Sequence, residues 1–277
     1  MVRFCALSWL MLAAALVPAA AEPVSPWVEE TSSKIRLVDA GPGPAKAERL
    51  AGIEIALGEG WKTYWRQPGA TGVPPRFDFS GSENVAAAEV AFPTPERQAD
   101  EEGVTNVYHH GVVLPVIVRA KDPAAPVILR LVADYGVCEK ICVPVRAETT
   151  LTLKATGAAA GSTAEAVRAA LAGTPKQVSL GASGPLAIRS VAKVGLEALE
   201  IVATAPAGMT AVLFAEAGDG SYAPSPDLPQ RRGDGALVFR MALDEAQPPA
   251  SGLRLTLAAA EDAIESAVSL DEIASRP

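Results

Sequence analysis

The chain has 277 residues, 49% of them hydrophobic, and a formal net charge of −8, which is typical of a folded, acidic globular protein. A surface of this sign repels phosphate backbones and anionic lipid headgroups, so nucleic acid and membrane surfaces are not expected partners. The length allows two ordinary domains, each with its own hydrophobic core.

The first 21 residues have the pattern of a secretory signal peptide. Arg3 precedes an apolar run from Phe4 to Val17, and small residues follow up to Ala21. The apolar run is shorter than the ~20 residues that a membrane-spanning helix needs. We therefore predict cleavage after Ala21, export, and no membrane insertion of the mature protein.

From residue 33 to residue 153 the sequence consists of short strand-like runs separated by glycine and proline. Alternation of apolar and polar residues is clearest in IEIAL and TTLTL, and most aromatic residues of the chain fall in this region. Many short strands without intervening helices predict an antiparallel, immunoglobulin-like all-β sandwich over residues 22–155. The expected strands are 33–40, 49–57, 61–65, 75–79, 85–92, 111–120, 125–137 and 146–153.

Residues 156–176 are predicted to form a linker that contains a short helix. Ser162 or Thr163 is the expected cap of a helix over residues 164–172, which Gly173 would end. Strand-like runs resume after the linker and predict a second, smaller β-sandwich domain over residues 177–277, although its alanine-rich stretches also fit local helices. The expected strands are 185–194, 196–205, 209–217, 235–243 and 251–260.

Cys138 and Cys142 are the cysteines that remain once Cys5 is removed with the signal. In an oxidising exported compartment an even pair implies a disulfide, which is either permanent or cycling. A tight hairpin between the two flanking strands would bring the Cβ atoms to the ~3.5–4.5 Å that a disulfide needs. So small a loop removes little chain entropy, which favours a redox couple over a structural staple.

A metal site is the third alternative for the pair, since His109 and His110 would complete a Cys2His2 set. Adjacent histidines point to opposite faces of a strand, which disfavours joint ligation. Lys140 and Arg146 offer positive charge to a thiolate, but acidic neighbours oppose them. The local sequence leaves the redox couple, the structural disulfide and the metal site open.

No nucleotide fingerprint, P-loop, zinc-protease motif or nucleophile elbow occurs in the sequence. We therefore expect no cofactor and no resident metal. Whether the protein is an enzyme depends on the cysteine pair.

Four stretches in a fixed order resemble the amino-terminal domain family of the thiol:disulfide interchange protein DsbD, over about residues 25–155. The resemblance implies a periplasmic sandwich in which Cys138 and Cys142 are the redox couple. Electrons would come from a membrane-embedded thiol reductase and pass to periplasmic thioredoxin-like proteins. The four stretches are GWKTYWRQPGATGVPPRFDF (Gly60–Phe79), AFPTPERQ (Ala91–Gln98), VYHHGVVLPVIV (Val107–Val118) and DYGVCEKICVPVRAE (Asp134–Glu148).

The resemblance also implies a loop that covers the cysteine pair, and the segment ADEEGVTNVYHHG occupies the corresponding place. We expect Tyr108 to be the covering aromatic residue, with Asp100, Glu101 and His109 nearby. In the alternative interpretation Tyr108 is an ordinary aromatic residue at a strand end.

Other aromatic residues of the matching motifs are interpreted as core residues. They are Trp61, Tyr64, Trp65 and Phe77.

Three residues between the cysteines resemble the branch of the family related to the suppressor-of-copper-sensitivity (ScsB-like) reductases, whose periplasmic region also has two sandwiches. Full-length members continue into a membrane domain with its own cysteines, and this sequence shows neither membrane spans nor further cysteines, so we expect the electron donor to be a separate protein. We also expect this chain to be a monomer. The processes implied are disulfide reduction, cytochrome c maturation and copper tolerance. Two alternatives are a non-catalytic scaffold with a structural disulfide and a periplasmic copper-binding protein, since thiolates suit Cu(I).

Overall fold

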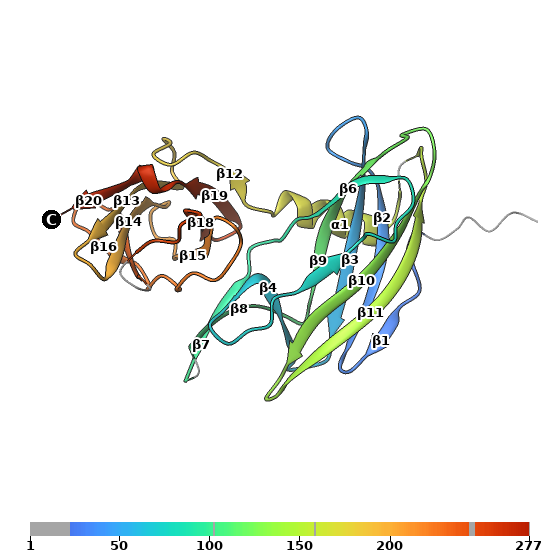
Figure 1. The fold of residues 1–277 in the computed structure, drawn as a ribbon, viewed down its shortest axis with the longest axis horizontal. Coiled ribbons are helices and arrows are strands. Elements are labelled where there is room, and N and C mark those ends of the chain that lie inside the picture. Colours follow the sequence, from blue (N-terminus) through green and yellow to red (C-terminus); the bar gives the residue numbers. More distant parts are fainter. Residues whose placement is uncertain (1–22, 102, 158, 244–246, 277) are drawn as a thin grey trace, which may run out of the picture.

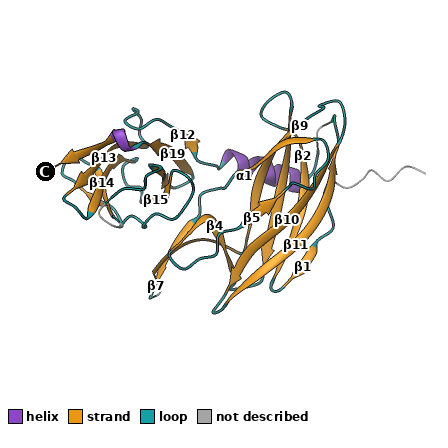
Figure 2. Cartoon of the chain, viewed as in Figure 1, coloured by secondary structure: helices purple, strands orange, loops and turns teal. Residues whose placement is uncertain are grey.

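The computed structural model describes residues 23–101, 103–157, 159–243 and 247–276 (Figure 1). The predicted signal peptide, residues 1–21, lies outside the described residues. Strands dominate the described part of the chain, and they form two β-sandwiches side by side (Figure 2). The prediction of an all-β, immunoglobulin-like fold followed by a second, smaller sandwich is therefore confirmed.

The amino-terminal sandwich consists of two sheets. One sheet has the strand order β1-β2-β3-β9-β6, and the other has the order β11-β10-β4-β8-β7 with β5 paired to β10. The strands are β1 (Val28–Glu30), β2 (Ser33–Pro42), β3 (Glu48–Leu57), β4 (Lys62–Gly69), β5 (Arg76–Asp78), β6 (Val85–Val90), β7 (Glu96–Asp100), β8 (Gly103–His109), β9 (Gly111–Ala120), β10 (Val127–Cys138) and β11 (Cys142–Leu153). The core lies between the sheets, where every second residue of a strand is apolar, as Ile35 and Leu37 of β2 and Leu129 and Leu131 of β10 are.

The carboxy-terminal sandwich has sheets with the orders β12-β19-β18-β15 and β16-β17-β14-β13-β20. Its core is separate and contains Leu199, Phe239 and Leu255. The strands are β12 (Lys176–Gln177), β13 (Ala187–Val194), β14 (Ala198–Thr204), β15 (Ala211–Ala217), β16 (Gln230–Arg231), β17 (Leu237–Ala242), β18 (Leu253–Ala259), β19 (Asp262–Val268) and β20 (Ile273–Arg276).

Helix α1 (Ser162–Ala172) lies on the outer face of β2, β3 and β9. The predicted cap is corrected, because the N-cap is Gly161 and no side chain makes a capping hydrogen bond. Packing holds the helix instead, as expected for a segment of 11 residues. Val167 sits directly on Gly52 of β3, where a Cβ atom would come within 2.4 Å of a Val167 methyl carbon.

The segment expected to form a covering loop is mostly the hairpin of β7 and β8. Sequence periodicity does not reveal β8, because two of its buried positions, Thr105 and Asn106, are polar. Asn106 is satisfied by donating from Nδ2 to the Gln67 carbonyl oxygen at 2.9 Å. A hydrogen bond that depends on the fold therefore replaces the apolar residue that a strand pattern requires.

Candidate functional site

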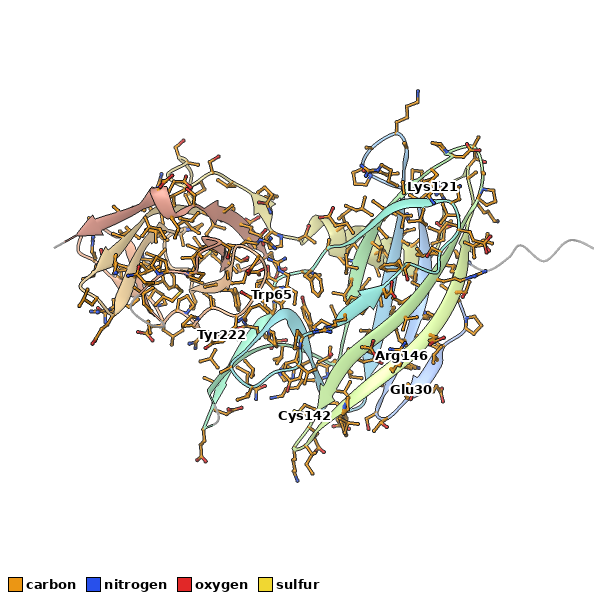
Figure 3. The ribbon with its side chains drawn as sticks, in the orientation of Figure 1. Glu30, Trp65, Lys121, Cys142, Arg146 and Tyr222 are labelled. Carbon is orange, nitrogen blue, oxygen red and sulfur yellow. A yellow bond between two sulfur atoms is a disulfide. The ribbon has the colours of Figure 1, made fainter. Side chains whose placement is uncertain are left out.

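The two cysteines form a disulfide at the end of the β10–β11 hairpin. Cys138 is the last residue of β10 and Cys142 the first of β11, and their Cα atoms are 4.2 Å apart as the final pair of the ladder. Cys142 lies near the end of this long hairpin (Figure 3). The tight turn between the two strands thus brings the cysteines close enough to form the disulfide, as their spacing in the sequence suggests.

The two sulfur-bearing residues differ in their exposure to solvent. Cys138 is only 6% exposed, whereas Cys142 is exposed. The neighbouring Ile141 is 77% exposed, so the hairpin tip combines an exposed cysteine with an exposed apolar side chain. Exchange requires access to a sulfur atom, so Cys142, the more exposed residue of the pair, is the candidate for attack by another thiolate.

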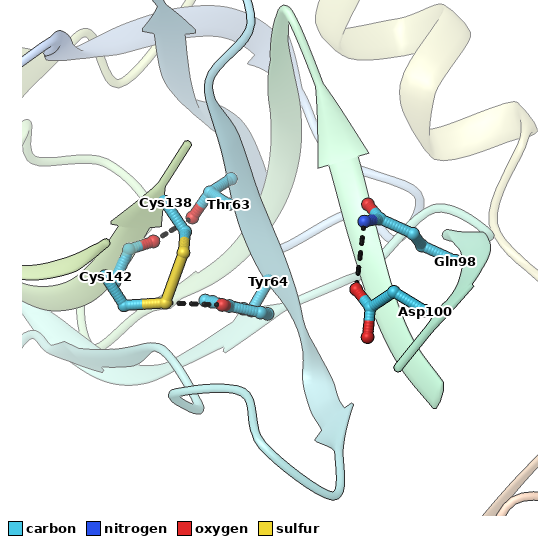
Figure 4. The surroundings of a disulfide bond; sticks show 7 residues. Thr63, Tyr64, Gln98, Asp100, Cys138 and Cys142 are labelled. Carbon is cyan, nitrogen blue, oxygen red and sulfur yellow. Dashed lines mark hydrogen bonds between the residues drawn. A yellow bond between two sulfur atoms is a disulfide. The ribbon is translucent and has the colours of Figure 1, made fainter. Parts of the chain in front are cut away.

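Tyr64 of β4 is the aromatic residue that contacts the pair. Its hydroxyl donates to the Cys142 sulfur over 3.1 Å, as Figure 4 shows. The ring is buried and packs with Val107 and Cys138 in a small cluster of its own. The sequence motif leads us to interpret Tyr64 as a core residue. That interpretation agrees with its burial but does not include its hydrogen bond to the Cys142 sulfur.

The strand register explains why Tyr64, in place of Tyr108, reaches the sulfur atoms. Residues that face one another across a ladder share one face of the sheet. Tyr108 pairs with Thr63, which pairs with the core residue Val137, so Tyr108 lies on the face opposite to Cys138. Its side chain is in the core, as in the alternative interpretation.

The surroundings of Tyr108 also separate it from the cysteine chemistry. Its hydroxyl donates to the Pro93 carbonyl oxygen at 2.6 Å. Burial raises the pKa of Tyr108 well above its ordinary value, so the phenol stays protonated.

A basic residue that the sequence analysis did not single out is the ladder neighbour of Cys138. Lys62 of β4 pairs with Cys138 on one side and with His109 on the other. Arg146, in contrast, binds the Asp134 carboxylate at 2.9 Å on the exposed face of the hairpin. The lysine of the WKTYW motif is therefore the cation in register with the sulfur atoms.

Two of the predicted covering residues lie at the β7–β8 turn. Asp100 ends β7, is in the surroundings of the disulfide, and accepts a hydrogen bond from Gln98 Nε2 at 3.3 Å (Figure 4). Glu101 is exposed in the turn that follows. Of the two carboxylates, only that of Asp100 is seen in the surroundings of the disulfide (Figure 4).

The loop between β4 and β5 covers the tyrosine directly. A Cβ atom on Gly72 would lie 2.7 Å from the Tyr64 ring, and one on Gly136 would lie 2.9 Å from Val73 Cβ. Gly72 and Val73 therefore close over Tyr64 and the end of β10. Gly72, the second glycine of PGATG, is the sequence signal that could have indicated this contact.

The Cys2His2 arrangement considered from the sequence is not formed by the residues that the structure describes. Among them, no group of three or more histidine, cysteine, aspartate or glutamate side chains is placed to hold a metal ion. Within the same residues, no helix has both the length and the apolar character needed to cross a membrane.

Comparison with known proteins identifies the amino-terminal sandwich. Residues 37–154 match the family described as the N-terminal domain of the thiol:disulfide interchange protein DsbD. Among solved structures, the chain is similar to the N-terminal periplasmic domain of ScsB from Proteus mirabilis, with a TM-score of 0.67 and 18% identity over 92% of this chain and 99% of that one. This likeness establishes a shared two-sandwich fold. No curated protein matches the chain.

Proposed function

Because residues 37–154 belong to the family of DsbD N-terminal domains, we propose that the protein is a periplasmic thiol–disulfide exchange module that carries electrons on Cys138 and Cys142. The observation that supports this most is the disulfide at an exposed hairpin tip, in which Cys142 is an exposed residue and a tyrosine hydroxyl lies 3.1 Å from its sulfur. A disulfide that served only as a staple would need neither feature.

Reduction of the module begins when a thiolate of the donor attacks the Cys142 sulfur. The Cys138–Cys142 bond breaks, a mixed disulfide forms between donor and Cys142, and Cys138 leaves as a thiolate that takes up a proton. The second thiol of the donor then displaces Cys142. In total the donor becomes a disulfide, and the module gains two electrons and two protons. A membrane-embedded thiol reductase fits this donor role.

Oxidation of the module follows the same path in reverse. The Cys142 thiolate attacks the disulfide of a periplasmic thioredoxin-like acceptor, and Cys138 resolves the mixed disulfide. The acceptor leaves as a dithiol, and the Cys138–Cys142 bond is restored. Disulfide reduction, cytochrome c maturation and copper tolerance are the processes that such electrons would serve.

The surroundings of Cys142 suit this role. A hydroxyl that donates to sulfur stabilises a thiolate more than a thiol, which favours Cys142 as the attacking group. Lys62, in register with Cys138, carries a positive charge that favours the departing thiolate.

The first test is the reduction potential of the pair, measured by equilibration with glutathione or dithiothreitol buffers and counting of free thiols by mass. An exchange module should have a potential in the range of known thiol shuttles, roughly −120 to −270 mV. A disulfide that remains intact well below about −300 mV would be structural, and the proposal would be wrong.

The second test assigns the roles of the two cysteines by trapping. The Cys138→Ala variant keeps the accessible thiol and should accumulate a mixed disulfide with an oxidised thioredoxin-fold protein, whereas Cys142→Ala should not. The adduct should disappear with excess dithiothreitol. If neither variant forms a reducible adduct, exchange with this class of partner is contradicted.

A further inference from the structure

The two sandwiches share a junction on β4, the strand that also carries Tyr64. Trp65 of β4 packs against Phe214 of β15 with ring centroids 5.5 Å apart. Phe214 is buried within the core cluster of the amino-terminal sandwich, although it belongs to a strand of the other one. Figure 3 shows Trp65 where β4 faces the carboxy-terminal sandwich. The second sandwich thus completes the core of the first.

A buried cluster of ion pairs lies beside this aromatic contact. Arg66 of β4 donates to Glu216 at 2.8 Å and also pairs with Glu265. Arg254 reaches Glu216 at 3.1 Å. Glu216 is only 1% exposed, and buried charges of this kind persist only when well-placed partners compensate them. The cluster therefore fixes the position of Arg66 with respect to β15, β18 and β19.

The part of β4 held in this way is irregular. Tyr64 pairs with Val107 of β8, but the next pair of this ladder joins Gly69 to Thr105, so the residues between them bulge out of the ladder. Gln67 in the bulge donates from Nε2 to the Ala223 carbonyl oxygen of the second sandwich at 3.4 Å. Bulges redirect neighbouring side chains and often lie beside active sites.

We propose that the carboxy-terminal sandwich is a positioning element for the disulfide. It holds the bulge that begins directly after Tyr64, and it thereby sets where the Tyr64 hydroxyl lies against the Cys142 sulfur. Hydrogen bonds weaken steeply with poor distance and angle, so a small shift of β4 changes the stabilisation of the Cys142 thiolate. This inference rests on the proposed function, because it gives the second sandwich a role in the same redox site.

The test is a double-mutant cycle on the dithiol–disulfide equilibrium of the full two-sandwich protein, measured against dithiothreitol. Glu216→Gln loosens the cluster from the far side of the junction, and Tyr64→Phe removes the hydroxyl. Each change should favour the disulfide by about threefold to tenfold, because a thiolate accepts a hydrogen bond more strongly than a disulfide sulfur does, so the reduced form loses more than the oxidised form. The double variant should behave like Tyr64→Phe alone. Glu83→Gln, in an exposed ion pair with Arg130, is the matched control and should change nothing.

Two results would overturn the inference. In the first, Glu216→Gln shifts the dithiol–disulfide equilibrium as much in the Tyr64→Phe background as in the wild-type background. In the second, Glu216→Gln lowers the melting temperature but leaves the dithiol–disulfide equilibrium unchanged. If Glu216→Gln does not fold, Phe214→Leu makes the same comparison through the aromatic contact. Small-molecule dithiols need no partner recognition. The double-mutant cycle can therefore show coupling between Glu216 and Tyr64 even if the trapping experiment yields no mixed disulfide with thioredoxin-fold proteins. That combination would contradict the proposed function and leave the positioning role standing.

Discussion

At the scale of single residues, neighbouring side chains of β4 serve opposite faces of one sheet. Thr63 and Trp65 face the core, while Lys62 and Tyr64 lie on the face of Cys138. The Thr63 hydroxyl donates to the carbonyl oxygen of Gly136 at 2.8 Å and ties β4 to the end of β10. The chemistry around the sulfur atoms is therefore set by every second residue of one strand.

Tyr64→Phe should slow alkylation of the Cys142 thiol at neutral pH by about threefold to tenfold, because the thiolate loses a hydrogen bond. The measurement is the rate of alkylation by iodoacetamide in a Cys138→Ala background. Tyr108→Phe is the control: it should cost about 1 kcal/mol of stability, through the lost bond to Pro93, and leave the alkylation rate unchanged. Equal effects of the two substitutions would refute the assignment of Tyr64.

Lys62→Gln should slow alkylation of the Cys138 thiol by up to about tenfold at low salt, because a positive charge in register with Cys138 is lost. The rate is measured on the reduced Cys142→Ala variant, and the effect should shrink as salt is added. Lys140→Gln removes an exposed charge of the hairpin turn as a control. A larger change with Lys140 than with Lys62 would contradict the register argument.

At the scale of elements, α1 depends on close contact with β3. Gly52→Ala should destabilise the protein by about 1–3 kcal/mol, since the new methyl group would meet Val167 at 2.4 Å and the helix would have to move. Urea unfolding measures the loss. Gly233→Ala, at a position with open space around it, is the matched control. A neutral Gly52→Ala would mean that the helix does not need this contact.

At the scale of the whole molecule, the ion cluster makes the two sandwiches interdependent. Arg66→Met leaves Glu216 and Glu265 buried with Arg254 as their remaining cation, and it should cost about 3–5 kcal/mol. Arg130→Met, in an exposed pair, should cost less than about 1 kcal/mol. Denaturant unfolding followed by circular dichroism makes the comparison. Similar losses for both variants would show that the cluster is dispensable.

The cluster should also make stability depend on pH. Burial raises the pKa of Glu265, but the charge of Arg66 and the hydrogen bond from Gln177 outweigh burial, and the pKa lies below its ordinary 4.5. The unfolded chain then binds the proton more readily, so this stabilisation is present above about pH 4.5 and is lost as the pH falls through the folded pKa.

The wild-type protein should be more stable than Glu265→Gln above about pH 4.5, and this difference in unfolding free energy should shrink below that pH. Urea titrations at several pH values measure the difference. Burial raises the pKa of Glu216, and Arg66 only partly offsets this. Glu216 therefore changes the stability with pH in the opposite direction to Glu265. Its contribution falls as the pH rises from about 4.5 through its folded pKa. An advantage over Glu265→Gln that does not change with pH would contradict the assignment to Glu265.

The all-β class, the succession of two sandwiches and the hairpin that joins Cys138 to Cys142 could be predicted from the sequence, because strand alternation and turn residues are local signals. The three-dimensional structure was needed to show that Tyr64, in place of Tyr108, contacts the Cys142 sulfur and that Lys62 is in register with Cys138. The parity of a strand against its neighbours depends on register, and a shift by one residue moves every side chain to the other face. The junction through Arg66 and Glu216 joins residues 150 positions apart, and no local pattern encodes such a pair.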